Sequence, residues 1–179
     1  MDTIFSTIVT SALVATVAGA AINAWLDGRR TRHATRFEAL STAIALEGYA
    51  IECAGTLTDY DLAVQSGAHA GAPIGRVPEL CELSIVAGFL RPKKASVANR
   101  IMILPQEIRQ ANQQVSFMWD VTADREEVWD EAAKQAAEMG LEALLLAKDV
   151  RQAFGLPKRE LVIGKFDVQA TLKEHADAT

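Results

Sequence analysis

The chain has 179 residues, half of them hydrophobic, and a formal net charge of −5 from 18 basic and 23 acidic side chains. A chain of this length can bury one core without disulfides or metals, and two cysteines are too few for a disulfide framework and suit a reducing compartment. The acidic balance argues against nucleic acid as a partner, because nucleic-acid-binding surfaces need an excess of Lys and Arg.

Residues 4–26 contain no charged side chain. As an α-helix this stretch would be ~35 Å long, enough to cross the ~30 Å hydrocarbon core of a bilayer. We therefore predict a single transmembrane anchor at residues 1–27, followed by a basic juxtamembrane segment at residues 28–36. The arginines expected to contact lipid headgroups are Arg29, Arg30, Arg32 and Arg36. Lys and Arg beside a span favour the cytoplasmic side, so the predicted topology is single-pass, with the N-terminus outside and the following domain in the cytoplasm.

Two other interpretations of residues 4–26 stay open. Residues 18–20, Ala-Gly-Ala, resemble the cleavage site of a signal peptide. A signal peptide, however, carries its positive charge before the apolar core, and that core is shorter. The other interpretation is a buried helix of a soluble domain, which the length of the uncharged run disfavours.

Small side chains recur every four residues along the predicted anchor, at Ser11, Ala15, Gly19 and Asn23. On a helix this spacing forms one face that allows two backbones to approach closely, with the Asn side chain able to hydrogen-bond across the contact. We call it the helix-association face. It predicts a homo-oligomer, although small residues are also common in membrane helices for no such reason.

Three later segments show apolar residues at alternating steps of three and four, the pattern of helices that pack side by side. The first seam is Ala39, Ala43, Leu46, Ala50, Cys53, Leu57, Tyr60 and Val64. The second seam is Val97, Ile101, Leu104, Ile108, Ala111, Val115 and Met118. The third seam is Trp129, Ala133, Ala136, Gly140, Ala143, Ala147, Val150 and Phe154. We predict a helical bundle at residues 37–157, with the first and third helices antiparallel because their small residues permit close packing. Apolar neighbours such as Phe37 and Ile44 are expected to widen the buried stripes.

The connections between these helices are marked by Gly and Pro. Residues 65–78 are rich in both and predict a loop. A short helix is expected at residues 78–89, with Pro78 in its first turn. Pro105 falls inside residues 93–119, which are therefore predicted to form a kinked helix or two helices.

The last predicted helix begins after Thr122, the expected N-cap, and ends at the Gly155 to Pro157 stop signal. Residues 158–179 are predicted to form a short helix and a frayed tail from Glu174 onward. A strand is compatible with residues 161–168, but a lone strand would lack a partner. The fold class is thus all-α: one N-terminal transmembrane helix followed by a cytoplasmic bundle of four or five helices.

No constellation of catalytic, cofactor-binding or metal-ligating residues is recognisable in the sequence. The histidines are scattered, at His33, His69 and His175, without metal-ligand spacing. The cysteines, Cys53 and Cys81, are interpreted as small buried hydrophobic residues. Glu47, Tyr49 and Glu52 interrupt the first seam and are interpreted as an exposed polar patch. A second basic cluster, interpreted as a solvated corner between helices, contains Arg91, Lys93, Lys94 and Arg100.

These observations predict a membrane-anchored, non-enzymatic interaction module: a scaffold, an adaptor or a small subunit of a membrane complex. Its expected partners are membrane lipids and either another protein or a second copy of the chain. The main alternative is a membrane-bound sensor that binds a small ligand inside the bundle. Such a pocket would be lined by Met102, Met118, Met139, Trp119 and Trp129. A third, less favoured alternative is an enzyme acting on a membrane-proximal substrate.

Overall fold

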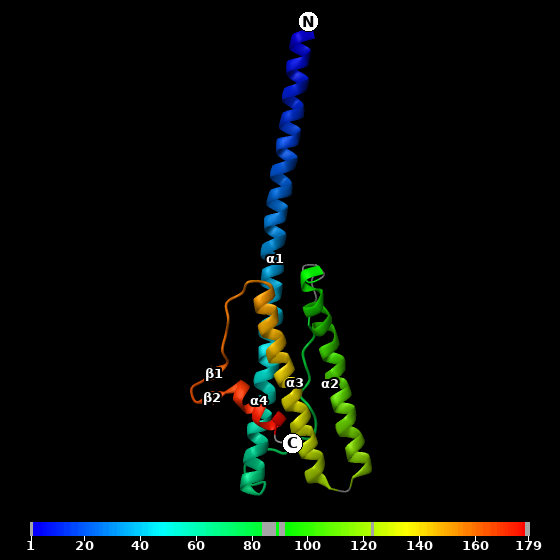
Figure 1. The fold of residues 1–179 in the computed structure, drawn as a ribbon, viewed down its shortest axis with the longest axis vertical. Coiled ribbons are helices and arrows are strands. Elements are labelled where there is room, and N and C mark those ends of the chain that lie inside the picture. The colour runs from blue at the N-terminus through cyan, green and yellow to red at the C-terminus, as the bar shows by residue number, and fades with distance from the viewer. Residues whose placement is uncertain (1, 84–88, 90–91, 123, 178–179) are drawn as a thin grey trace. The chain divides into compact units, whose positions relative to one another are not determined.

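The computed structural model describes residues 2–83, 89, 92–122 and 124–177, and describes residues 2–22 by their backbone alone. The chain divides into two compact units, residues 1–37 and 38–179. The helix α1, Asp2–Ser66, forms the first unit and enters the second. The other elements are η2 (Pro92–Lys94), α2 (Ala95–Val121), α3 (Arg125–Ala153), β1 (Val162–Ile163), β2 (Phe166–Asp167) and α4 (Val168–Asp177). The described residues are mostly helical, which confirms the all-α class (Figure 1).

No helix among the described residues combines the length and the apolar composition that a bilayer span requires. The side chains of residues 2–22, which make up most of the predicted anchor, lie outside the description. The transmembrane anchor therefore stays a prediction from the sequence.

Helices α1 and α3 pack against each other in opposite directions, as the small residues of their seams predict. The backbone of Gly140 on α3 lies so close to α1 that a Cβ built on it would be 2.8 Å from Cys53 Cβ. Further along the pair, Tyr60 Oη donates a hydrogen bond to Asp130 Oδ1 at 2.5 Å. Later positions on α1 thus meet earlier positions on α3, and the antiparallel arrangement is confirmed.

The three seams form the core of residues 38–179. Nearly every member is buried, including Leu46 and Leu57 of the first seam and Leu104 of the second. Val64, at the end of the first seam, is instead 61% exposed. The expected widening of the buried stripe is wrong at Phe37 and Ile44, which are 72% and 49% exposed.

Helix α2 is continuous and contains Pro105, so the predicted division into two helices is wrong. Its buried face, which includes Leu104, Ile108 and Val115, packs on α3. Gln114 Nε2 donates to Glu131 Oε1 at 2.6 Å near one end of this contact. Burial of the face on both sides of Pro105 compensates for the one backbone hydrogen bond that a proline removes.

Both ends of α3 are set by local sequence features, an N-cap residue and a C-terminal glycine. The position predicted for the N-cap is wrong. The N-cap is Asp124, whose carboxylate accepts the backbone N–H of Glu126 at 2.9 Å. Thr122, the predicted cap, instead accepts the N–H of Asp124. At the other end Gly155 has a φ of +60°, and the N–H of Leu156 donates to the carbonyl of Arg151 at 2.8 Å. This is a Schellman motif, which confirms the predicted stop.

Residues 67–83 form a loop, so the predicted loop is confirmed for residues 67–78, while residues 65–66 still belong to α1. The predicted helix at residues 78–89 is wrong for residues 78–83. Residues 84–88 of that helix lie outside the described residues. The amide side chain of Asn112 on α2 explains part of the difference. It accepts the N–H of Val77 at 3.0 Å and donates to the carbonyl of Val77 at 3.2 Å. The loop backbone finds its partners on α2 and needs no helix to satisfy them.

The C-terminal segment contains a small hairpin that the sequence analysis rejected. Strand β1 pairs antiparallel with β2, with Val162 opposite Asp167, across a turn in which Gly164 has a φ of +64°. The missing partner strand thus lies within the same segment. Helix α4 follows, as predicted, and buries Leu172 against α3. It runs to Asp177, so the predicted fraying is wrong for residues 174–177, and residues 178–179 lie outside the described residues.

Candidate functional site

A buried carboxylate stands at the centre of the most unusual polar cluster in residues 38–177. Glu47 on α1 is 3% exposed, and Arg151, in the last turn of α3, is 6% exposed. Arg151 Nε donates to Glu47 Oε1 at 2.5 Å, and Arg151 Nη2 donates to Glu47 Oε2 at 3.0 Å. Such a two-point contact matches the planar guanidinium to the carboxylate. The interpretation of Glu47 and Tyr49 as exposed residues is therefore wrong, since Tyr49 is also 3% exposed, whereas Glu52 is exposed as expected.

The same cluster also binds the segment that follows α3, through residues 157 and 159. After the Schellman turn, the carbonyl of Pro157 accepts a hydrogen bond from Arg151 Nη1 at 2.9 Å. Arg159 Nη1 then reaches back to Glu47 Oε2 at 3.1 Å. Hydrogen bonding to Glu47 raises the pKa of Arg151 above its usual value, so the guanidinium stays charged. One buried carboxylate thus joins α1, α3 and the segment after α3.

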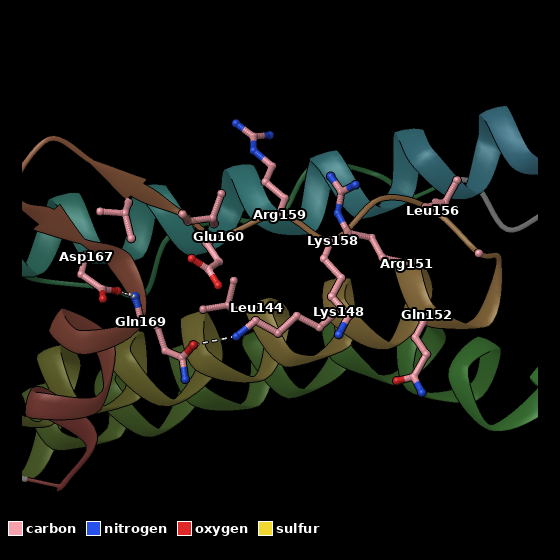
Figure 2. Close-up of a pocket in the computed structure, with 13 residues that line it drawn as sticks. Leu144, Lys148, Arg151, Gln152, Leu156, Lys158, Arg159, Glu160, Asp167 and Gln169 are labelled. Carbon is pink, nitrogen blue, oxygen red and sulfur yellow. Dashed lines mark hydrogen bonds between the residues drawn. The ribbon is translucent and has the colours of Figure 1, made fainter.

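Between α3 and this returning segment lies a groove of about 640 Å³, which we call the arm groove (Figure 2). Its volume is within the range of about 300–1,000 Å³ typical of small-molecule sites. Its lining comes from α3 and from residues 155–169: Leu144, Lys148, Arg151, Gln152, Gly155, Leu156, Lys158, Arg159, Glu160, Leu161, Val162, Asp167 and Gln169. No pattern in the sequence indicates this groove.

The arm groove has more positive than negative side chains. Lys148 Nζ donates to the neutral amide of Gln169 at 2.6 Å, a bond drawn across the groove in Figure 2. Lys158 makes no ion pair among the described residues, and Arg159 is half exposed. Of the two acidic residues, Asp167 already accepts the backbone N–H of Gln169. The groove therefore holds cationic groups whose charge is incompletely neutralised.

The lining combines charged and apolar side chains. None of its described residues is a Ser, Thr, Cys or His, and its ionisable groups are Lys, Arg, Asp and Glu. The apolar contribution comes from Leu144 and Leu161, which are nearly buried, and from Leu156 and Val162. A second groove, of about 830 Å³, lies between residues 75–83 and α2. Among the described residues no group of three or more metal-ligating side chains is assembled.

The sequence-predicted site residues fall in the first unit. In the helix-association face, Ser11, Ala15 and Gly19 have side chains outside the description, and Asn23 is exposed. The four predicted headgroup contacts are all exposed: Arg29, Arg30, Arg32 and Arg36. The Arg29 guanidinium lies 5.7 Å from the ring centre of Trp25, a cation–π distance. The contact of these residues with lipid stays a prediction.

The second basic cluster is not a single solvated corner. Arg100 pairs with Glu142 at 2.7 Å and with Asp149, which links α2 to α3. Lys94 lies over the ring of Phe154, with its Nζ 3.3 Å from the centre. Arg91 and the side chain of Lys93 are outside the described residues. The two described members therefore act separately, one in an ion-pair network and one in a cation–π contact.

Comparisons of the chain with protein-family models, with curated proteins and with solved structures find no match. The fold defines the class, a small α-helical bundle.

The two cysteines differ in exposure, and one of them contradicts the sequence interpretation. Cys53 is fully buried, as expected, whereas Cys81 is exposed. Burial raises the pKa of Cys53 to about 12. We expect a thiol reagent to modify Cys81 in the native protein and Cys53 only after unfolding, because the thiolate is the reactive form. Peptide mass spectrometry after brief alkylation measures both sites. Equal labelling of the two thiols would contradict the packing of α1 on α3.

Alkaline pH is expected to destabilise the bundle. Burial raises the pKa of the Tyr49 hydroxyl and of the Cys53 thiol, so both stay protonated in the fold and ionise in the unfolded chain. The stability contributed by Cys53 is complete below its ordinary value of 9.0 and is lost as the pH rises toward about 12. Urea denaturation midpoints measured at about pH 8 and about pH 10 test whether stability falls as the pH rises. A midpoint that rises with pH would contradict it, and Cys53→Ala should show a smaller decrease.

Proposed function

We propose that this protein is a membrane-anchored, non-enzymatic interaction module. The observation that carries the proposal is the uncharged stretch at residues 4–26, followed at once by exposed arginines at residues 29–36. The α-helical backbone of this stretch supports the proposal, since only internally hydrogen-bonded backbone is stable in hydrocarbon. In this proposal residues 1–27 are the anchor and residues 28–36 contact anionic headgroups.

The positive charges after the stretch favour a single-pass topology with the C-terminal domain in the cytoplasm. That domain comprises the bundle, residues 37–157, and the C-terminal segment, residues 158–179. Its partner is proposed to be another protein or a second copy of the chain. Exposed apolar side chains support a protein partner: Phe117 and Val121, one turn apart on α2, are 62% and 60% exposed. We infer that this pair of side chains lies in the contact with that partner.

Extraction of membranes with alkaline carbonate tests the anchor. The full chain should stay in the membrane pellet, and a variant lacking residues 2–27 should be released. Replacing all four arginines with glutamine should leave the pellet fraction unchanged but randomise the orientation of a C-terminal reporter. Release of the full chain by carbonate would overturn the proposal.

Cross-linking in mild detergent tests self-association through the helix-association face. Gly19→Leu should abolish a dimer, because the added side chain separates the two backbones. Ala21→Leu is the matched control, since it adds similar bulk about two helix positions away, on the opposite face. Co-purification of a stoichiometric second protein would identify a different partner. A partnerless monomer would overturn the interaction proposal.

Ligand binding is the second candidate function, and the arm groove favours it. The location differs from the one expected from the sequence. Met102 is 57% exposed and Trp119 is 42% exposed, so neither side chain encloses a bundle interior. Neither of the two described grooves is lined by Met118, Met139 or Trp129.

A further inference from the structure

We propose that the arm groove binds an anionic amphiphile: a molecule with a carboxylate or phosphate head and a short apolar tail. The inference goes beyond the interaction proposal and stands on the groove alone. Its failure would leave the anchor and the protein partner untouched. The two sources of such chemistry are a free fatty acid and a lysophospholipid, and they share the head and tail that the groove would recognise.

The anionic head is selected by three basic side chains that the fold leaves incompletely neutralised. Arg151 is excluded from this role, since both of its contacts with Glu47 and its contact with Pro157 occupy it. Lys148 donates a hydrogen bond to the neutral amide of Gln169, and Lys158 makes no ion pair among the described residues. Arg159 donates to Glu47 through one nitrogen only, and Glu47 also binds Arg151. A bound anion would replace the amide of Gln169 at Lys148 with a stronger, charge-assisted hydrogen bond.

The acidic residues of the groove reduce this attraction without cancelling it. Asp167 caps α4 by accepting the backbone N–H groups of Gln169 and Ala170. These two hydrogen bonds partly compensate the negative charge of Asp167. Glu160 is exposed. With Arg151 paired to Glu47, the lining keeps a net positive charge, because its three other basic groups outnumber its two carboxylates.

The apolar tail contacts mainly Val162, which is 53% exposed, and Leu156, which is partly buried. Leu144, one turn before Lys148 on α3, and Leu161 also line the groove, but they expose only 3% and 7% of their surface. Figure 2 shows the lining spread along α3, from Asp167 and Gln169 at one end toward Gln152 and Leu156 at the other. The site is thus elongated, with charge beside apolar surface.

Strand β1 offers a matched pair of positions for testing the tail. Val162 lines the groove, whereas Ile163, the next residue, does not. Successive side chains of a strand point to opposite sides. Both are exposed, at 53% and 61%, so substitution of either should leave the fold intact.

The experiment uses the full chain in discs of zwitterionic lipid and a dansylated fatty acid as the fluorescent probe, with empty discs subtracted. We expect saturable binding that decanoate displaces and decanol, its neutral analogue, does not. Lys148→Gln combined with Lys158→Gln should weaken binding at least about tenfold, and Val162→Asp should weaken it similarly. Lys173→Gln and Ile163→Asp, outside the groove, should leave the affinity unchanged.

Competition distinguishes the two sources. Displacement by decanoate more strongly than by lysophosphatidate assigns the site to free carboxylates, and the reverse order assigns it to phosphate-bearing lipids. Either order supports an anionic amphiphile. Absence of saturable binding up to about 1 mM probe would overturn the proposal, as would equal displacement by decanol. Equal losses in the groove variants and their controls would overturn it as well.

Discussion

Replacing Glu47 with alanine is expected to lower the free energy of unfolding by about 3–5 kcal/mol, the cost of leaving a buried charge unpaired. The charge left behind is that of Arg151, which is 6% exposed and is bound to Glu47 through two nitrogens. Arg159 can return to solvent, since half of its side chain is already exposed. Urea denaturation of the full chain in mild detergent, followed by far-ultraviolet circular dichroism, measures the loss.

Two further variants separate this cost from a general effect of removing acidic residues. Glu52→Ala, on the same helix but exposed, should change the stability by no more than about 0.5 kcal/mol. Replacing the pair together, Glu47→Leu with Arg151→Met, should recover most of the stability, because no uncompensated charge remains. A loss below about 1 kcal/mol for Glu47→Ala would mean that water reaches Arg151 and that the cluster is not buried in solution.

The bundle helices were predictable because the buried face of a bundle helix requires apolar residues at alternating steps of three and four. The third seam combines Gly140 with alanines, and this pattern already indicated a close contact with α1. The stop at Gly155 was equally readable, since a left-handed residue after a helix favours glycine. A seam does not show whether other elements also cover the residues beside it, so the exposure of Ile44 was not predictable.

The polar features were harder to predict because their partners lie far apart in sequence. Glu47 and Arg151 are 104 positions apart, and nothing local to either residue indicates that they meet. The signal that was present is the position of Glu47 directly after Leu46 of the first seam, at the edge of a buried face. The β1–β2 hairpin was missed for a related reason. Two residues per strand are too few to leave a period-two pattern.

The arm groove was hard to predict for both reasons: it depends on which segment covers α3 and on contacts between residues far apart in sequence. It exists because the Schellman turn at Gly155 sends the chain back along α3, and because Arg151 and Arg159 hold that segment near Glu47. Sequence patterns identify the turn but not the distance at which the returning segment stands from α3. The groove is therefore a consequence of tertiary contacts, and its ligand hypothesis required the structure.

Gly140→Ala is expected to lower the free energy of unfolding by about 1–3 kcal/mol, the usual cost of overpacking a core. The new Cβ would lie 2.7 Å from Leu172 Cδ2 and 2.8 Å from Cys53 Cβ, both inside contact distance. Leu172 is fully buried, so its methyl group has little room to rotate away. Cys53 Cβ is attached to the backbone of α1, so it cannot yield without moving the helix. This cost outweighs the gain of up to about 1 kcal/mol from replacing a helical glycine with alanine.

The matched control is the same substitution at Gly48. This residue is also helical, but a Cβ built on it meets nothing within 4 Å. Gly48→Ala should therefore stabilise the protein, by about 0.5–1 kcal/mol, because only the helix-propensity term remains. Thermal and urea denaturation of the two variants should thus give shifts of opposite sign from one chemical change. A stabilising Gly140→Ala would show that α1 and α3 stand further apart in solution than their packed seams require.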